Sequence, residues 1–476
     1  MPGIVSHGAY VPRYRLGPET SGWPVPFQRA VANFDEDSIT MAVAAGQDCL
    51  RGHDREQIDG LLFASSTSPY AEKQGAAIIA TALDLRRDIF TADITDVLRS
   101  GTAALKAALD SVAAGSAGRV LVVAADTRQG PPRSDTERNS GDGAAAFLIG
   151  GDDVMAEAIG SHSLSVNMLD NWRSAGDSFV RSWEDRFAIE EGLERILPEA
   201  VQGFCQKYGM NPDSFDRVAC FAPDARRHGR LVRQMGFAPE QVQEPYFGRM
   251  GNTGAAFPLM LLSGALDELE PNKNILVVSY GDGSDVMAFR TTELVEAASM
   301  GKGGLNRHLD TGTVLDSYET YAKWRDIWTT DEAARRPAPS SPSVAALWRE
   351  SDKNMRLHAG KCVSCGYVQY PQQRVCVNCQ RREESNPVRL SEQPAEVFTY
   401  SMDYIAGAVD TPLVVSVVDF HCGGRMLCMM TDRELEEVHV GMPVTMSFRK
   451  LRVVNGIHNY YWKAIPRRFE SEASLG

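Results

Sequence analysis

The chain has 476 residues and a net charge of −13, with 62 acidic against 49 basic side chains. This length allows more than one domain, and the acidic balance argues against a nucleic-acid partner, which needs a basic face. The first residues lack the pattern of a signal peptide, and no apolar run approaches the roughly 18 residues of a membrane helix. We therefore expect a cytoplasmic protein without nucleic-acid or membrane partners.

Predicted strands and helices alternate from the N-terminus to about Thr292. The near-continuous apolar run 119–125 predicts a strand buried on both faces, and a second strand follows a polar loop at 143–150. Segments 274–280 and 286–292 repeat this strand–loop–strand order. The repetition indicates an internal duplication of an α/β unit.

The segment 91–105 predicts the end of a strand, a tight turn and the start of a largely apolar helix. Such a turn is a place where folds present a nucleophile, because N–H groups at a helix start stabilise developing negative charge. The turn is therefore the first place to search for catalytic side chains.

Five motifs resemble, in order, those of the hydroxymethylglutaryl-CoA synthase branch of the thiolase superfamily, especially its archaeal-type members. The resemblance covers residues 2–328 and implies the thiolase fold, an α/β fold in which two βαβαβαββ halves stack into five α/β/α/β/α layers. We place these halves at residues 1–155 and 156–330. The motifs are Ser65–Lys73, Gly101–Ala104, Asp170–Arg173, Gly251–Gly254 and Leu315–Tyr321.

The family reaction needs a cysteine that carries the acyl group, a glutamate as general acid/base and a histidine that orients the acceptor thioester. The resemblance puts Leu98 at the cysteine position and Ser66 at the glutamate position, and the histidine falls near Phe221 or Ala222. Leucine cannot form a thioester. The three changes together argue against ordinary hydroxymethylglutaryl-CoA synthesis.

Part of the family site remains. Asn252 is at the position that hydrogen-bonds a thioester oxygen in relatives, although asparagine also serves simply as a turn residue. The glycine loop Gly281–Asp285 is where relatives have a loop near the nucleophile, and it too is consistent with a plain turn. The other candidate catalytic residues are Ser66, Tyr70, Asp224 and His228.

Two further features near Asp224 have alternative interpretations. The basic side chains Arg226 and Arg230 indicate either a solvated helix face or a site for CoA phosphates. Cys220, the only thiol predicted near the pocket, indicates either a packed core residue or a substitute nucleophile.

The C-terminal third has a different pattern. Residues 331–343 are rich in Pro, Ser and Ala and predict a linker. Residues 344–390 predict a helix at 344–357 and a zinc ribbon, and residues 391–470 predict strands with a hairpin at Gly423–Gly424. A ribbon followed by a small β-barrel resembles the zinc-ribbon/OB-fold family that accompanies acyl-CoA thiolases.

Two Cys-x-x-Cys pairs, Cys362/Cys365 and Cys376/Cys379, are ten residues apart and can hold one structural Zn²⁺ tetrahedrally. The alternative is a redox disulfide pair. Four thiolates leave no open coordination position, so we expect the metal to stabilise the ribbon. The other cysteines are expected to be buried thiols: Cys49, Cys205, Cys220, Cys422 and Cys428.

Three functions fit the sequence. The first is an enzyme, a lyase or acyltransferase, that forms or cleaves a carbon–carbon bond in a CoA thioester without an acyl-enzyme. The second is a non-catalytic subunit that binds CoA or assembles with an active thiolase or synthase. The third is covalent chemistry through Cys220. The resemblance also implies a homodimer, or a hetero-oligomer with a thiolase-fold partner.

Overall fold

The computed structural model describes residues 1–296, 304–328, 340–382, 384–405 and 409–468. The chain divides into two compact units. The predicted linker 331–343 lies outside the described residues except for 340–343. Unit 1 comprises Met1–Ala32, Asp37–Ala80 and Leu85–Tyr318, and unit 2 comprises Asn33–Glu36, Thr81–Asp84 and Glu319–Gly476.

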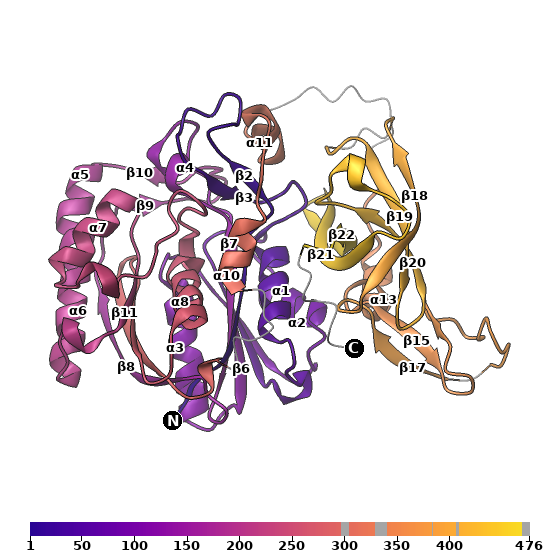
Figure 1. The fold of residues 1–476 in the computed structure, drawn as a ribbon, viewed down its shortest axis with the longest axis horizontal. Coiled ribbons are helices and arrows are strands. Elements are labelled where there is room, and N and C mark those ends of the chain that lie inside the picture. The colour runs from indigo at the N-terminus through magenta and orange to yellow at the C-terminus, as the bar shows by residue number, and fades with distance from the viewer. Residues whose placement is uncertain (297–303, 329–339, 383, 406–408, 469–476) are drawn as a thin grey trace. The chain divides into compact units, whose positions relative to one another are not determined.

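Unit 1 is built on one mixed sheet of nine strands in the order β11-β12-β13-β8-β1-β7-β6-β4-β5 (Figure 1). Strands β1 and β8 pair only through Gly3↔Glu157 and Ile4↔Ala156, so two half-sheets meet there. The strands are β1 (Gly3–Tyr10), β4 (Gly60–Ser65), β5 (Phe90–Thr95), β6 (Arg119–Asp126), β7 (Gly143–Gly150), β8 (Ala156–Ser165), β11 (Arg217–Cys220), β12 (Asn274–Val278) and β13 (Gly283–Thr291).

Helices α3 (Ser100–Ala113) and α8 (Phe257–Glu268) form the central layer, because each contacts strands of both half-sheets. Helix α1 (Ser38–Cys49) covers the outer face of β1, β6 and β7, and α6 (Glu194–Tyr208) covers β8 and β13 (Figure 1). Every residue of α8 from Phe257 to Leu266 is buried, as its run of apolar side chains requires. The layers confirm the predicted thiolase-like α/β fold.

The two halves are not equal. The first half has strand β5 beside β4, whereas its counterpart in the second half is reduced to one parallel bridge, Val218↔Val242. The remaining strands and α-helices of unit 1 are short. They are β2 (Tyr14–Leu16), β3 (Arg29–Val31), β9 (Asn171–Trp172), β10 (Arg181–Ser182), β14 (Thr313–Val314), α2 (Gly75–Ala82), α4 (Asp135–Asn139), α5 (Asp185–Phe187), α7 (Ala225–Gln234) and α10 (Gly304–Asp310).

Two helical glycines allow a matched test of packing in unit 1. A Cβ on Gly101 in α3 would lie 2.4 Å from the carbonyl oxygen of Ala255, whereas one on Gly229 in α7 would meet nothing within 4 Å. We expect Gly101→Ala to lower the free energy of unfolding by about 1–3 kcal/mol. Gly229→Ala should raise it by about 0.5–1 kcal/mol through helix propensity. Urea unfolding of the full chain measures both changes in the free energy of unfolding. If the two substitutions changed it in the same direction, the packing described here would be contradicted.

Unit 2 contains a small sheet and a closed barrel. The ribbon sheet has the order β16-β15-β17, and the barrel has the order β18-β19-β20-β22-β21 (Figure 1). Gly423 and Gly424 both have positive φ and turn β19 into β20, which confirms the predicted hairpin. The strands are β15 (His358–Cys362), β16 (Val368–Gln369), β17 (Ser385–Arg389), β18 (Ala395–Asp403), β19 (Leu413–Phe420), β20 (Arg425–Met430), β21 (Pro443–Val454) and β22 (Ile457–Pro466).

Two expectations are wrong, one for the C-terminal helix and one for the burial of the single cysteines. The helix predicted over 344–357 is two short helices, α12 (Val344–Arg349) and α13 (Ser351–Asn354), and Leu357 has a φ of 55°, which no α-helix allows. Cys422 is exposed because it lies in the β19–β20 turn, and Cys205 is only partly buried. Helix α11 (Tyr318–Trp324) precedes α12 in the sequence.

Candidate functional site

The turn between β5 and α3 is fixed by a second loop from the other half of unit 1. The guanidinium of Arg99 donates to the carbonyl oxygen of Gly281 at 2.8 Å and forms an ion pair with Asp285 at 3.0 Å. The hydroxyl of Thr102 contacts Asp285 at 2.9 Å. These contacts place Leu98, just before the helix, against the glycine loop 281–285.

A glycine is needed where the two loops meet. A Cβ on Gly281 would lie 3.0 Å from the backbone nitrogen of Leu98 and 3.1 Å from that of Arg99. Within the part of the chain that the structure describes, neither of these N–H groups donates a hydrogen bond, whereas the N–H of Ser100 donates to Val97. Two backbone donors are therefore available beside Leu98.

Two adjoining cavities meet at Leu98, of about 250 Å³ and about 150 Å³. The larger is also lined by Ser66 and the smaller by Phe221 and Asn252. The three positions that the sequence assigned to the lost family residues therefore surround one space. Both cavities share Leu98, Arg128, Asp170 and Asn171.

These cavities hold no thiol, since no cysteine of the described chain lines either of them. Cys220 is fully buried, and burial raises the pKa of its thiol to about 12. A thiol with that pKa is almost entirely protonated at neutral pH and is a poor nucleophile. Phe221, the next residue, stacks on Tyr280 with ring centroids 5.9 Å apart.

Ser66 belongs to a set of hydroxyl groups around a buried carboxylate at the end of β6. Asp126 accepts hydrogen bonds from the hydroxyls of Ser65, Ser66 and Thr67 at 2.8–3.0 Å. Its oxygens also accept the backbone N–H groups of Ser66 and Ala255, each at 2.7 Å. Five donors leave this carboxylate no spare capacity for another partner.

The side-chain amide of Asn252 hydrogen-bonds to backbone groups on both sides. Its amide nitrogen donates to the carbonyl oxygen of Ala222 at 2.8 Å, and its oxygen accepts the N–H of Gly254 at 2.8 Å. Asn252 lines the smaller cavity, but both halves of its amide hold the loop in place. The structure thus gives Asn252 a clear structural role.

The other predicted catalytic residues lie in different places. Asp224 caps the N-terminus of α7 and lines the smaller cavity. His228 is 3% exposed and packs against Phe247, and burial lowers its pKa to about 4. Neither His228 nor Tyr70 is among the residues that line the two cavities.

Several ionisable residues that were not candidates from the sequence line the cavities, and among them are Arg128, Asp170 and Asp282. Asp282 is exposed as a residue, yet partial removal from water and the neighbouring carboxylate of Asp170 raise its pKa. Asp170 belongs to the motif Asp170–Arg173, and Asp282 belongs to the glycine loop Gly281–Asp285. Arg128 follows the end of β6, and side chains beyond the carboxyl ends of parallel strands are frequent ligand contacts, so this position carried a usable signal.

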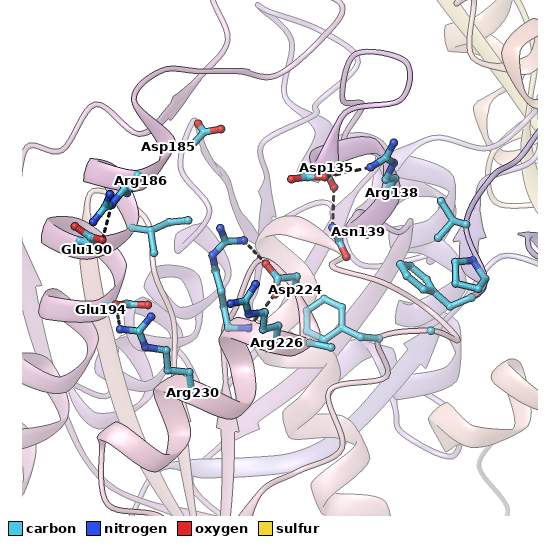
Figure 2. Close-up of a pocket in the computed structure, with 18 of the residues that line it drawn as sticks. Asp135, Arg138, Asn139, Asp185, Arg186, Glu190, Glu194, Asp224, Arg226 and Arg230 are labelled. Atoms are coloured by element: carbon cyan, nitrogen blue, oxygen red, sulfur yellow. Dashed lines mark hydrogen bonds and ion pairs between the residues drawn. The ribbon is translucent and has the colours of Figure 1, made fainter.

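A wider groove of about 1210 Å³ borders the smaller cavity and is rich in arginine. Figure 2 shows Arg186 paired with Glu190 and Arg230 paired with Glu194, at 2.8 and 3.1 Å. Among the described residues, Arg226 has no such partner. The arginines of the groove are Arg138, Arg186, Arg226, Arg227, Arg230 and Arg233.

In unit 2, the sulfur atoms of Cys362, Cys365, Cys376 and Cys379 all lie within 4.8 Å of one another. Gly366, with a φ of 73°, makes the tight turn after the first pair. Four thiolates at this spacing fit a tetrahedral Zn²⁺ site. The cluster is compatible with the predicted zinc ribbon.

Comparison with known proteins agrees with this architecture. Residues 205–290 match the family model "3-Oxoacyl-[acyl-carrier-protein (ACP)] synthase III C terminal". Residues 388–449 match "ChsH2, C-terminal OB-fold domain". The barrel of unit 2 is therefore an OB-fold.

Curated relatives match 68% of this chain over nearly their full length. Hydroxymethylglutaryl-CoA synthase of Methanopyrus kandleri is 33% identical over 341 residues, which are 68% of this chain and 97% of the relative. The enzyme of the same name from Methanocaldococcus jannaschii is 31% identical, over 68% of this chain and 99% of the relative.

Solved structures show the same fold. MvaS in complex with 3-hydroxy-3-methylglutaryl coenzyme A has a TM-score of 0.60 at 21% identity, over 72% of this chain and 94% of its own. An HMG-CoA synthase complexed with CoA has a TM-score of 0.62 at 18% identity, over 72% and 95%. The described part of the chain contains no helix with the length and apolarity to span a membrane.

Proposed function

Since the chain belongs to the hydroxymethylglutaryl-CoA synthase family, we propose that it forms or cleaves a carbon–carbon bond in an acyl-CoA thioester without an acyl-enzyme. The observation that carries this proposal is Leu98, which occupies the meeting point of two cavities that no cysteine lines. An aldol-type reaction needs no nucleophile. It needs a base and donors for an enolate oxygen.

In the cleavage direction, the carboxylate of Asp282 removes the proton from the β-hydroxyl group of the acyl chain. The bond between the α and β carbons breaks, its electron pair moves toward the thioester, and the β carbon becomes a carbonyl. The raised pKa of Asp282 favours this role, because it makes the carboxylate more basic than an ordinary one. The proton then returns to the α carbon.

The enolate oxygen needs donors that are not already in use. Asn252 is less suitable than the sequence indicated, since its amide nitrogen donates to a backbone carbonyl. The N–H of Ser100, at the start of α3, already donates to Val97. The N–H groups of Leu98 and Arg99 are the better candidates, because they donate to no group in the described chain. Ser66 and Asp224 line the cavities and could orient the hydroxyl directly or through water.

We place the phosphates of CoA in the arginine groove (Figure 2). Its six arginines exceed its five acidic residues, and Arg226 and Arg233 form no ion pair in the described chain. Guanidinium groups bind phosphates with two parallel hydrogen bonds. The groove adjoins the smaller cavity through Asp224 and Arg227, so a thioester would reach Leu98.

For unit 2, we propose one structural Zn²⁺ in the four-cysteine cluster.

For the assembly, we propose a homodimer or a hetero-oligomer with a thiolase-fold partner. Strand β5 supports this, because it is the edge of the nine-stranded sheet and its Phe90 is 68% exposed. None of the nine cysteines is in a disulfide, which is consistent with a cytoplasmic protein.

The second candidate is a non-catalytic subunit that binds CoA or assembles with an active thiolase or synthase. One observation favours it: both the amide nitrogen and the amide oxygen of Asn252 already hydrogen-bond to the backbone. Retention of the motif therefore has a structural explanation, and it does not require catalysis.

The test is turnover of a panel of β-hydroxyacyl-CoA and β-ketoacyl-CoA thioesters by the full chain, with products identified by mass. We expect cleavage or condensation, and Asp282→Asn should slow it by about 10²–10⁴-fold. Asp152→Asn, at an exposed carboxyl group outside the cavities, is the control. Absence of turnover, together with co-purification of a cysteine-bearing thiolase, would support the subunit instead. An acyl adduct on Cys220 would contradict both.

A further inference from the structure

Arg128 lines both of the cavities that meet at Leu98, and its charge has no partner in the described chain. It follows β6 by two residues, and its side chain is partly buried. The guanidinium forms neither a hydrogen bond nor an ion pair with any described residue. Because polar groups in a confined space normally have a partner, its five N–H donors point to an acceptor that the chain itself does not supply.

The neighbouring carboxylates do not serve as that acceptor. Asp126 is close enough to attract Arg128, but the five donors described above already occupy its two oxygens. Asp170 attracts Arg128 electrostatically, yet no ion pair joins these two described side chains. The acceptor is therefore a group that enters the cavities.

The stem of Arg128 is held in place by the loop that Asn252 fixes. A Cβ on Gly254 would lie 2.8 Å from Cδ of Arg128 and 2.3 Å from Oδ2 of Asp126, and Gly254 has a φ of 63°. The glycine thus leaves room for the aliphatic part of the arginine. The fold positions the side chain, and its charged end remains available.

Asp282, the base of the proposed reaction, lines the larger cavity together with Arg128. No hydrogen bond or ion pair joins these two described side chains. Partial removal from water and the carboxylate of Asp170 raise the pKa of Asp282, and the cation that opposes this rise is Arg99. Arg128 therefore does not weaken the base, although the two residues line one cavity.

The reaction in this cavity needs a positive charge beside the oxygen that loses its proton. Water has a pKa of about 15.7, and the β-hydroxyl group of an acyl chain is an acid of similar strength. Even with a raised pKa, a carboxylate is a far weaker base than the alkoxide that it would have to form. A cation that hydrogen-bonds to the β-oxygen stabilises the alkoxide and reduces this difference. The N–H groups of Leu98 and Arg99 are assigned to the other oxygen, that of the thioester enolate.

We propose that Arg128 is a further catalytic residue, whose guanidinium hydrogen-bonds to the β-oxygen of the acyl chain. This inference rests on the proposed function, because Asp282 acts on the same oxygen. In cleavage, Asp282 takes the proton of the β-hydroxyl group, and the negative charge on the β-oxygen develops beside Arg128. The bond between the α and β carbons then breaks, which gives a carbonyl compound and the enolate. In the reverse direction, Arg128 polarises the carbonyl group that the enolate carbon attacks, and the β-oxygen receives the proton of Asp282.

The first test is turnover of a β-hydroxyacyl-CoA by the full chain and by variants of Arg128. Arg128→Met removes the charge and the donors, so kcat should fall about 10²- to 10³-fold, and Arg128→Lys should retain part of the rate. In Arg128→Ala, guanidinium ion added at millimolar concentration should restore part of kcat, because it replaces the missing group in the space that is left. A residue that only supported the fold would not be rescued in this way.

The second test is equilibrium binding, which needs no turnover. β-Hydroxybutyryl-CoA and butyryl-CoA have equal chain length and differ only in the β-hydroxyl group. Calorimetry with the full chain should show about 10-fold tighter binding of the hydroxylated thioester, as expected for a hydrogen bond to a charged group. Arg128→Met should abolish this preference and leave butyryl-CoA binding unchanged. Arg226→Gln, in the groove, should weaken both ligands by the same factor.

The outcomes separate the role of Arg128 from the proposed function. If the unchanged protein is active and Arg128→Met keeps its kcat, Arg128 is not catalytic, and the proposed function stands without it. Equal binding of the two thioesters, or a preference that survives Arg128→Met, excludes the contact with the β-oxygen whether or not the chain is active. An inactive protein whose preference depends on Arg128 would contradict the proposed catalysis and support the contact. Failure to bind either thioester would contradict both.

Discussion

Asp35→Ala is expected to lower the free energy of unfolding by about 3–5 kcal/mol, because it leaves buried positive charges without their partner. The carboxylate of Asp35 is 1% exposed and contacts Lys463 at 2.7 Å and Arg449 at 3.1 Å. Urea unfolding of the full chain, followed by tryptophan fluorescence, measures the loss. Trp462 is a suitable reporter, since it is buried in the neighbouring barrel strand.

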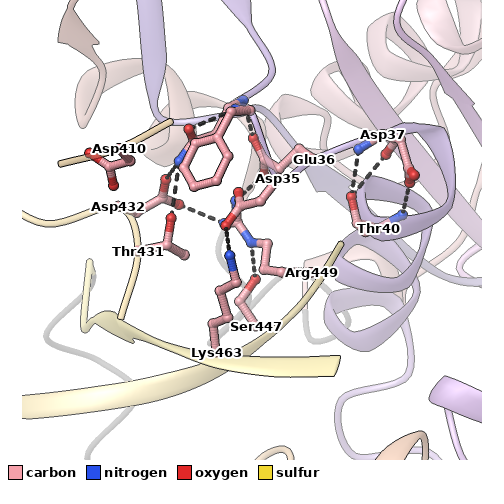
Figure 3. A network of polar contacts seen from close by, with 12 residues as sticks. Asp35, Glu36, Asp37, Thr40, Asp410, Thr431, Asp432, Ser447, Arg449 and Lys463 are labelled. Atoms are coloured by element: carbon pink, nitrogen blue, oxygen red, sulfur yellow. Dashed lines mark hydrogen bonds and ion pairs between the residues drawn. The ribbon is translucent and has the colours of Figure 1, made fainter. Parts of the chain in front are cut away.

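The effect should be large because the members of the network drawn in Figure 3 around Asp35 are buried. Arg449 also pairs with Glu36 at 3.0 Å and with Asp432 at 2.6 Å. The three acids and two bases are each at most 5% exposed. Removing one member of such a set exposes none of the others to solvent, so the remaining charges cannot be hydrated.

An exposed ion pair on the same barrel is the control. Asp419 contacts Arg425 at 2.5 Å, with side chains 34% and 50% exposed. Asp419→Ala should cost only about 0–1 kcal/mol, because surface pairs are screened by water. Equal losses for the two variants would contradict the burial of the Asp35 network.

The same network gives stability a dependence on pH. Burial alone would raise the pKa of Asp35, but attraction by Lys463 and Arg449 outweighs burial and lowers it. The folded-state pKa is thus below the unfolded value of about 3.9. The contribution of Asp35 is fully present above that value and is lost as the pH falls through the folded pKa. Stability of the unchanged protein should therefore fall more steeply in acid than that of Asp35→Asn.

The fold was largely predictable because apolar patterns are local. The run 119–125 forms most of β6, which is buried from Val120 to Asp126, and the two glycines at 423–424 lie in the β19–β20 turn. The Leu98 turn was recognisable because a strand, a turn and a Gly-Thr-Ala-Ala helix start are adjacent in sequence. These features need no knowledge of distant contacts.

The contacts that set the chemistry were less predictable because they join distant segments. The sequence did not indicate that the hydroxyl of Ser66 would donate its proton to Asp126, or that His228 would be buried and not line the groove. Nor did it show that Asn33–Glu36 would belong to unit 2, where Asp35 meets Arg449, 414 residues away. Such pairings depend on tertiary structure, which residue patterns do not encode locally.

Loss of zinc should have the second large effect, and it should be confined to unit 2. We expect one Zn²⁺ per chain by elemental analysis, and Cys376→Ser should remove it, since Cys376 is a buried member of the four-cysteine cluster. Zinc binding to such sites contributes about 10–16 kcal/mol to folding. The sheet β16-β15-β17, which is too small to have its own core, should therefore unfold locally.

Hydrogen exchange distinguishes this local unfolding from a global one. Amides of β15 should lose protection in Cys376→Ser and after chelation, whereas those of β6 in unit 1 should keep theirs. Cys422→Ser is the matched control, because Cys422 is exposed in the β19–β20 turn and lies outside the cluster. A full zinc content in Cys376→Ser would contradict the four-cysteine site. If the β15 amides kept their protection without metal, the ribbon would be stabilised by its own packing. The four thiolates would then have a role other than stabilising the ribbon.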